Sequence, residues 1–167
     1  KWVAERTESF LTDTHGRDHV THAELAVTND GKFLGFKNET IANLGAYARV
    51  FGTVTPTYLF GPCATGVYTI PAAYSNVKAV YTNTAPVDAY RGAGRPEATY
   101  TIERLVEKAA MELGIDRTEI RMKNFPTAFP FKQTLVHTVD SGDYVAGLEK
   151  AKQMADYAGF DARRKKS

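Results

Sequence analysis

The sequence predicts an α+β fold in which a β-hairpin and a mixed sheet carry two or three packed helices. Three observations support this prediction. Residues 22–41 alternate apolar and polar side chains around a turn, which is typical of a hairpin. Residues 98–113 repeat apolar side chains every three or four positions, which is typical of an amphipathic helix. The order of the elements, a hairpin, then strands, then helices, favours helices packed on a mixed sheet.

Size and composition limit what the chain can be. Its 167 residues fit one ordinary domain, and a hydrophobic content of 43% supports a core. No apolar run approaches the roughly 18 residues that a transmembrane helix needs, so we expect a soluble protein with no transmembrane segment. The net charge is only +2, and the basic run at residues 163–166 is interpreted as a solvated end rather than a site for nucleic acid or anionic lipid.

The single cysteine, Cys63, excludes an internal disulfide and fits a reducing compartment, so we expect a cytoplasmic protein. It lies in the Gly/Pro-rich segment LFGPCATG, with no histidine nearby in the sequence. We therefore interpret Cys63 as a small buried or half-buried residue rather than a reactive thiol.

The first third of the chain is expected to be β structure. Residues 1–8 (KWVAERTE) indicate a strand that no turn, cap or methionine precedes, so we expect the chain to be a piece of something longer. Residues 23–27 form the first hairpin strand, residues 29–31 the turn and residues 33–40 the second strand.

Residues 43–66 (NLGAYARVFGTVTPTYLFGPCATG) contain too many glycines and prolines for a long helix and too many apolar residues for a solvated loop. We expect a buried irregular stretch with one short helix near Ala46–Phe51. Its aromatic residues read as core, as the lining of a substrate channel or, preferably, as a surface that contacts another domain: Tyr47, Phe51, Tyr58 and Phe60. Residues 66–70 and 76–84 then predict two short strands separated by residues 71–73.

Helices follow. Pro96 lies at the first turn of the helix that includes residues 98–113, and Gly114 lies just past its end. Asp116 caps a second helix, which Phe125 and Pro126 end. Ser141 or Asp143 begins a last helix, whose inner apolar stripe consists of Val145, Leu148, Ala151, Met154, Ala155 and Ala158. We divide the single partial domain, residues 1–167, into a hairpin region (1–42), an irregular segment with strands (43–90), and a loop with helices (91–159).

Residues 86–100 (PVDAYRGAGRPEATY) place a glycine turn between a strand and a helix. Such a turn exposes main-chain N–H groups beside the positive end of a helix, and Arg91 and Arg95 can add charged donors. An anionic or oxo-bearing ligand fits this pattern. A tight turn with two surface arginines fits the spacing equally well, and a nucleotide phosphate loop would lack its lysine and its third glycine. Glu97 is interpreted as interacting with the N–H groups of its own helix.

The sequence of this region also resembles that of a known protein family. The run TNTAPVDAYRGAGRPEATYTIERLVEKAAMELGID, together with RMKNF, KWVAERTESF, HGRDHVTHAELAVTNDGKFL, NLGAYA, GVYTIPAAY, DSGDY and ADYAGF, resembles the molybdopterin-binding large subunit of the xanthine oxidase family. Within that family it is most similar to the non-copper, or form II, branch of carbon monoxide dehydrogenase large chains. The resemblance implies that Arg91, Gly92, Ala93 and Gly94 lie beside the molybdenum and present main chain to its oxo and dithiolene ligands.

Two departures from the family bear on the substrate. The copper-containing branch has a cysteine at the position of Gly92, so the resemblance implies no copper here. Xanthine-oxidising members have a phenylalanine at the position of Ala93, so its absence argues against a purine. A molybdenum hydroxylase that oxidises an aldehyde or small heterocycle, with carbon monoxide as the alternative, is the implied function.

The resemblance also implies what surrounds the chain. The parent enzyme uses molybdopterin cytosine dinucleotide and passes electrons to iron–sulfur and FAD subunits. The family's glutamate base lies downstream of this sequence and its Gly-Phe-Gly cofactor loop lies upstream, so no catalytic residue is assigned here. We expect the chain alone to bind cofactor poorly, to be inactive, and to self-associate through the surfaces it exposes. The alternative is a non-catalytic α+β module for binding or assembly.

Two further groups of residues are weighed as sites. His15, His19 and His22 are spaced as metal ligands can be, but strand residues alternate between faces, so we interpret them as structural or surface histidines and predict no metal site. Arg104 and Lys108 are interpreted as surface charges of the helix that follows the glycine turn.

Overall fold

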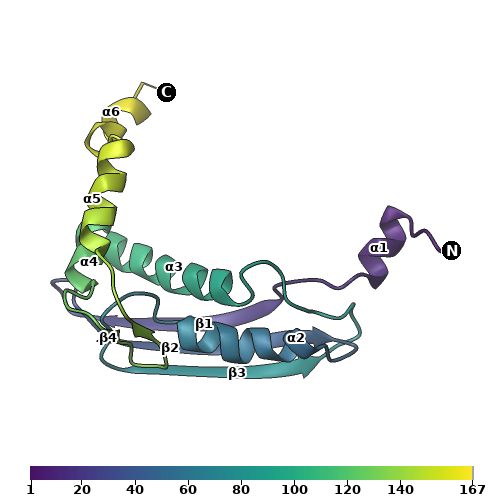
Figure 1. Ribbon diagram of the computed structural model, residues 1–167. Coiled ribbons are helices and arrows are strands. Elements are labelled where there is room, and N and C mark those ends of the chain that lie inside the picture. Colours follow the sequence, from purple (N-terminus) through teal and green to yellow (C-terminus); the bar gives the residue numbers. More distant parts are fainter. Residues whose placement is uncertain (167) are drawn as a thin grey trace.

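A three-stranded mixed sheet is the centre of the computed structural model, which describes residues 1–166 (Figure 1). Strand β1 (His19–Val27) pairs antiparallel with β2 (Phe33–Gly45), and β2 pairs parallel with β3 (Ala73–Tyr81). Helix α3 (Arg95–Leu113) lies across one face of this sheet. The predicted α+β fold with helices on a mixed sheet is confirmed.

The hairpin forms where it was predicted, and an irregularity in its strand pairing lets two aromatic side chains enter the core. The pairing register shifts between Ala26 and Val27, so Val27 pairs with Phe33 while Leu25 pairs with Phe36. Because the shift offsets the alternation of side chains by one residue, Phe33 and Phe36 are both buried although three positions separate them.

The core lies between the sheet and α3. Helix α3 buries one stripe at four-residue spacing: Ala98, Ile102, Val106 and Ala110. Phe33 and Tyr68 meet edge to face with ring centroids 5.4 Å apart, and Phe125 stacks on Tyr68 with ring centroids 5.7 Å apart. The predicted helix, with Pro96 in its first turn and Gly114 after its end, is confirmed.

Helix α4 (Arg117–Asn124) is held at its start by the predicted cap. The Asp116 carboxylate accepts hydrogen bonds from the main-chain N–H groups of Thr118 at 2.7 Å and Glu119 at 3.2 Å, and from the Tyr157 hydroxyl at 2.8 Å. Partial burial opposes ionisation, but the hydrogen bonds from Thr118, Tyr157 and Glu119 outweigh it and lower the pKa of Asp116 to about 2.

We predict that Asp116→Ala lowers the free energy of unfolding by about 1 kcal/mol, the usual cost of losing a helix cap. Because the pKa of Asp116 is lower in the folded chain, the cap stabilises the fold at pH values above its ordinary pKa of 3.8, and this contribution is lost as the pH falls towards 2. Urea titrations at pH 7 and pH 2.5 measure both effects. A difference between wild type and variant that is as large at pH 2.5 as at pH 7 would contradict the assignment.

The segment after β2 differs from the prediction. Helix α2 (Val50–Val54), the π-helical turn η1 (Thr55–Phe60) and the 3-10 turn η2 (Gly61–Cys63) form one helical run, where a single short helix near Ala46–Phe51 was expected. Its glycines allow close contact with the rest of the chain and do not interrupt the helical run. A Cβ on Gly52 would lie 2.4 Å from the carbonyl oxygen of Val87, so glycine lets the run pack against the chain before the glycine turn.

Two strand predictions are wrong. Residues 66–70 form no strand, because Tyr68 and Ile70 enter the core from a turn whose Thr69 N–H donates to the carbonyl of Asn124. Residues 1–5 are not a strand, and helix α1 (Arg6–Thr12) follows them with no buried residue.

The inner stripe predicted for the last helix is not buried. Helix α5 (Tyr144–Met154) begins after Asp143, whose carboxylate accepts from the N–H of Ala146. It extends away from the sheet beyond α4, followed by the short turn η3 (Tyr157–Gly159) and helix α6 (Phe160–Arg164) (Figure 1). The loop between α4 and α5 contains the two-residue strands β4 (Phe131–Lys132) and β5 (Thr138–Val139).

Candidate functional site

The glycine turn has a left-handed backbone over three consecutive residues. Gly92 has φ +92°, Ala93 has φ +39° and Gly94 has φ +86°. Two hydrogen bonds close the turn, from the Ala93 N–H to the carbonyl of Tyr90 at 2.7 Å and from the Arg95 N–H to the carbonyl of Gly92 at 3.1 Å. The turn leads directly into the first residue of α3, as the sequence predicted.

The two glycines are required by contacts within the chain itself. A Cβ on Gly94 would lie 2.6 Å from the Thr55 carbonyl oxygen and 2.8 Å from the Phe60 nitrogen, both main-chain atoms of η1. A Cβ on Gly92 would lie 2.6 Å from the ring of Pro96. Packing within the chain therefore accounts for glycine at positions 92 and 94 whether or not a ligand binds.

The turn still offers main-chain donors to a ligand. Within residues 1–166, the N–H groups of Gly92, Gly94 and Glu97 donate to no main-chain acceptor. They lie at the N-terminal end of the 19-residue helix α3, which carries a partial positive charge, and Arg91 and Arg95 are exposed beside them. Unpaired N–H groups, a helix N-terminus and two arginines together fit an anionic or oxo-bearing group.

Glu97 does not do what was predicted. Its carboxylate accepts no hydrogen bond from the helix N–H groups; instead Oε1 lies 3.6 Å from Nε of Arg17. The other oxygen, Oε2, is buried without a hydrogen-bond partner in the described chain. The Glu97 carboxylate therefore leaves the first N–H groups of α3 without a side-chain acceptor, although it remains a negative charge in the first turn.

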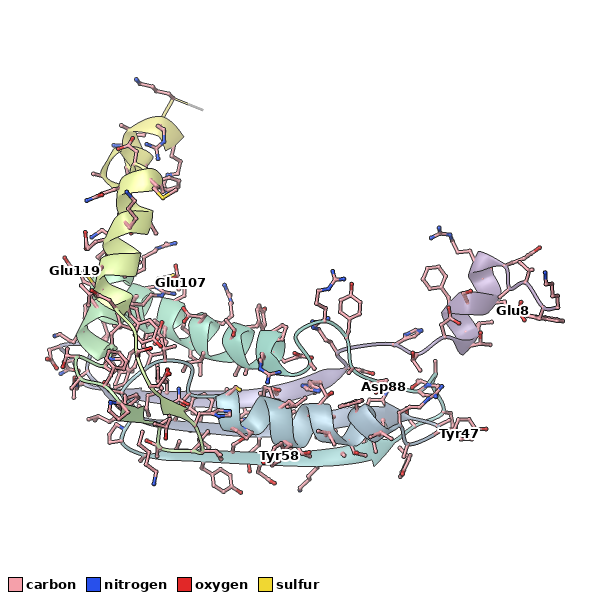
Figure 2. All side chains as sticks on the ribbon, in the orientation of Figure 1. Glu8, Tyr47, Tyr58, Asp88, Glu107 and Glu119 are labelled. Atoms are coloured by element: carbon pink, nitrogen blue, oxygen red, sulfur yellow. The ribbon has the colours of Figure 1, made fainter. Side chains whose placement is uncertain are left out.

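The segment before β1 lies along the glycine turn, which no signal in the sequence indicated. His15 forms a parallel bridge with Val87, its N–H donates to the carbonyl of Pro86 at 2.9 Å, and its carbonyl accepts from the N–H of Asp88 at 2.8 Å. Figure 2 shows Asp88 beside the chain that leads from α1 into β1. Arg17, two residues later, contacts the turn directly.

The three histidines lie apart from one another. His15 contacts the carbonyl of Phe10, and His22 lies on the outer face of the sheet, 3.3 Å from Glu24. His19 lies on the inner face, edge-on to Phe60 at 5.4 Å. Burial lowers the pKa of His19, against the opposing charges of Glu97 and Asp18, and its buried Nδ1 has no partner in the described chain.

A groove of about 450 Å³ lies between β1 and α3, and Arg17 is one of its lining residues. His19, Glu97, Tyr100 and Arg104 line it together with neighbouring residues. Arg104 and Lys108 are exposed, as predicted, and Lys108 pairs with Glu112 at 3.0 Å.

Cys63 has a neighbour that its sequence context did not indicate. The Sγ atom of Cys63 lies 3.4 Å from Nε2 of His137, which is 74 residues away in the chain. Burial raises the pKa of the Cys63 thiol, with Arg95 acting in the opposite direction. Because the thiolate is the reactive form, this agrees with a half-buried, unreactive cysteine.

The aromatic residues of the helical run divide into two groups. Phe60 is fully buried, whereas Tyr47, Phe51 and Tyr58 are 71%, 52% and 73% exposed. Figure 2 shows Tyr47 past the end of β2 and Tyr58 on the helical run, well apart from each other. Phe60 is therefore a core residue, and the other three form no single pocket lining in the described chain.

Comparisons with known proteins agree with these features. Residues 1–125 match the family model of the molybdopterin cofactor-binding domain. The chain is 42% identical to the carbon monoxide dehydrogenase large chain of Hydrogenophaga pseudoflava and 36% identical to a subunit of the 6-hydroxypseudooxynicotine dehydrogenase complex of Paenarthrobacter nicotinovorans. The matches cover 97% and 95% of this chain but only 21% of each relative.

Solved structures give the same result. Quinoline 2-oxidoreductase from Pseudomonas putida 86 superposes with a TM-score of 0.91 at 32% identity, covering 99% of this chain and 21% of that one. The Cu,Mo-CO dehydrogenase superposes with a TM-score of 0.86 at 34% identity, covering 98% and 21%. Across residues 1–166, none of the helices has the length and apolar character that crossing a membrane requires. The chain spans about a fifth of the length of these relatives, and it belongs to the molybdopterin cofactor-binding domain family.

Proposed function

We propose that the chain is one section of the catalytic large subunit of a molybdenum hydroxylase of the carbon monoxide dehydrogenase large-chain type. In this proposal Arg91, Gly92, Ala93 and Gly94 form its cofactor-contacting loop. The observation that carries the proposal is the set of unpaired N–H groups at the N-terminus of α3, in a chain that matches such subunits over nearly its whole length.

The residues of the turn suit an anionic metal cofactor. When bound, molybdopterin with its molybdenum would supply the redox centre at which a substrate is hydroxylated with oxygen from water. The N–H groups of Gly92 and Gly94 would donate to the cofactor's oxygen or sulfur atoms, and Arg91 and Arg95 would balance its negative charge. The left-handed backbone at residues 92–94 holds these donors in place without a side chain between them and the ligand.

The finer features of the parent enzyme belong to the same proposal. We place the single partial domain, residues 1–167, in a cytoplasmic enzyme that uses molybdopterin cytosine dinucleotide and transfers electrons to iron–sulfur and FAD subunits. Gly92 offers no thiolate for copper, and Ala93 offers no ring to stack on a purine, so an aldehyde or a small heterocycle is the proposed substrate class, with carbon monoxide as the alternative. Two relatives are named for quinoline and 6-hydroxypseudooxynicotine, which supports a heterocycle.

We predict that the 167-residue chain alone carries no molybdenum and self-associates. Its exposed large apolar side chains include Trp2, Phe10, Val50, Phe51, Tyr58 and Met154. Such surfaces associate when nothing covers them. Native mass spectrometry with elemental analysis measures both properties, and the complete subunit that contains this sequence is the matched sample.

The expected result is a metal-free dimer or larger species for the chain, and one molybdenum with a pterin dinucleotide for the complete subunit. Molybdenum bound to the isolated chain would contradict the prediction that the other walls of the site lie elsewhere. A complete subunit without molybdenum, however produced, would contradict the proposed function and favour a non-catalytic module.

A further inference from the structure

We propose that Arg17 is a positioning residue that fixes the orientation of the main chain in the glycine turn, and that the turn depends on it to present the N–H of Gly92. This inference rests on the proposed function, in which that N–H faces the cofactor. Arg17 is 74 residues from Arg91 in the sequence. Its guanidinium group contacts the glycine turn and the first turn of the helix that follows it.

One guanidinium group reaches the turn at three points. Its Nη2 donates to the carbonyl of Arg91, its carbon lies 4.8 Å from the centroid of the Tyr90 ring, and its Nε lies 3.6 Å from Oε1 of Glu97. Tyr90 begins the turn, Arg91 enters it, and Glu97 lies in the first turn of α3. A planar group with several donors can make these contacts together, whereas a lysine ammonium cannot both stack and donate in this way.

The hydrogen bond to Arg91 has a consequence for its neighbour. The Arg91–Gly92 peptide bond is trans, so the carbonyl of Arg91 and the N–H of Gly92 lie in one plane and point in opposite directions within it. Since Arg17 holds the carbonyl, the N–H of Gly92 is directed away from Arg17, where it has no main-chain acceptor. Glycine at position 92 would otherwise let this peptide plane rotate, because glycine tolerates both signs of φ.

The backbone around Arg17 is shaped for this contact. A Cβ on Gly16 would lie 2.6 Å from Cβ of Tyr90, so only glycine allows the two segments to approach this closely. Arg17 itself has φ +56°, a left-handed conformation that is uncommon for a residue with a side chain. Such a conformation persists only where the surroundings enforce it, and here the pairing of His15 with residues 86–88 holds the segment against the turn.

The experiment compares Arg17→Met with Arg104→Met. Arg104 lines the same groove, but its side chain makes no hydrogen bond or ion pair in the described chain, so its variant is the matched control. Hydrogen exchange on the cofactor-free complete subunit, followed by mass spectrometry of peptides that span the turn, reports on the Ala93 and Arg95 amides, whose hydrogen bonds close the turn. We expect Arg17→Met to accelerate their exchange about tenfold or more, with the amides of the β1–β2 ladder and of the Arg104→Met variant unchanged.

A second variant separates a positioning role from a general loss of stability. Arg17→Lys keeps the charge opposite Glu97 but loses the planar group over Tyr90, and we expect an intermediate acceleration confined to the turn. Molybdenum content is then measured in the complete subunit, where Arg17→Met is expected to retain less than half of the wild-type metal and Arg104→Met all of it.

The outcomes distinguish this inference from the function on which it rests. Equal exchange in the Arg17→Met and Arg104→Met chains, or faster exchange throughout the β1–β2 ladder as well, would overturn the positioning role whatever the complete subunit binds. Faster exchange in the turn together with full molybdenum retention would also overturn it. A wild-type complete subunit that binds no molybdenum would overturn the proposed function instead, while the exchange result would still decide whether Arg17 orders the turn.

Discussion

Gly94→Ala is expected to lower the free energy of unfolding by about 3 kcal/mol or more. A side chain at φ +86° costs about 1 to 2 kcal/mol by itself. The added Cβ would also lie 2.6 Å from the Thr55 carbonyl oxygen and 2.8 Å from the Phe60 nitrogen, which are main-chain atoms that cannot rotate away. Relieving such a contact costs about a further 1 to 3 kcal/mol. Urea denaturation followed by circular dichroism measures the change.

Ala93→Gly is the matched control for this substitution. Ala93 already has a left-handed backbone at φ +39° in the same turn, so glycine there relieves strain and is expected to change the free energy of unfolding by less than about 1 kcal/mol. If the two variants unfolded at the same urea concentration, that result would contradict the close packing of Gly94 against the main chain of η1.

Asn124→Ala is expected to cost about 3 to 5 kcal/mol. The Asn124 side chain is fully buried, and its Oδ1 accepts from the N–H of Phe33 at 2.9 Å. Its Nδ2 donates to the carbonyls of Gly31 and Ile120, both at 2.8 Å. Alanine leaves the hairpin's N–H and carbonyl buried without partners, and each such loss costs about 1 to 3 kcal/mol. The same urea titration measures it.

Asn29→Ala provides the comparison, because Asn29 lies in the same hairpin turn but is exposed. Its substitution is expected to change the free energy of unfolding by less than about 0.5 kcal/mol. A small effect at Asn124, similar to that at Asn29, would show that helix α4 is not what fixes the hairpin turn in place.

Local signals accounted for the elements that were predicted correctly. The alternation around residues 29–31, the apolar stripe of α3 and the cap at Asp116 each act within a few residues, so the sequence contains them in full. The helical run over residues 50–63 was missed because its glycines read as helix breakers, whereas Gly52 is needed for contact with Val87, a residue distant in sequence.

The last helix shows the opposite error. Its apolar stripe predicted burial, but Val145 is 40% and Met154 is 79% exposed. An amphipathic pattern predicts that one face of a helix is buried, but it does not predict which surface buries that face. Within residues 1–166 none of this stripe is fully buried, although Leu148 is half-buried, which is what we expect if the chain is a section of a longer subunit.

The candidate site was assigned from the glycine turn together with the family resemblance, but its supporting contacts were not predicted. Arg17 with Arg91, and Cys63 with His137, are each 74 residues apart, so no local pattern could pair them. The predicted role of Glu97 was wrong for the same reason, because its partner Arg17 lies just before β1, far away in the sequence. The sequence thus predicted the glycine turn and missed the distant residues that contact it.

A structure of the complete subunit with its cofactor tests the central claim most directly. The account predicts that an oxygen or sulfur atom of the molybdenum cofactor lies within hydrogen-bond distance, about 3.5 Å or less, of the main-chain nitrogen of Gly92 or Gly94. It also predicts that Arg17 still holds the carbonyl of Arg91. A cofactor bound out of reach of residues 91–94 would contradict the assignment of the glycine turn as the cofactor-contacting loop.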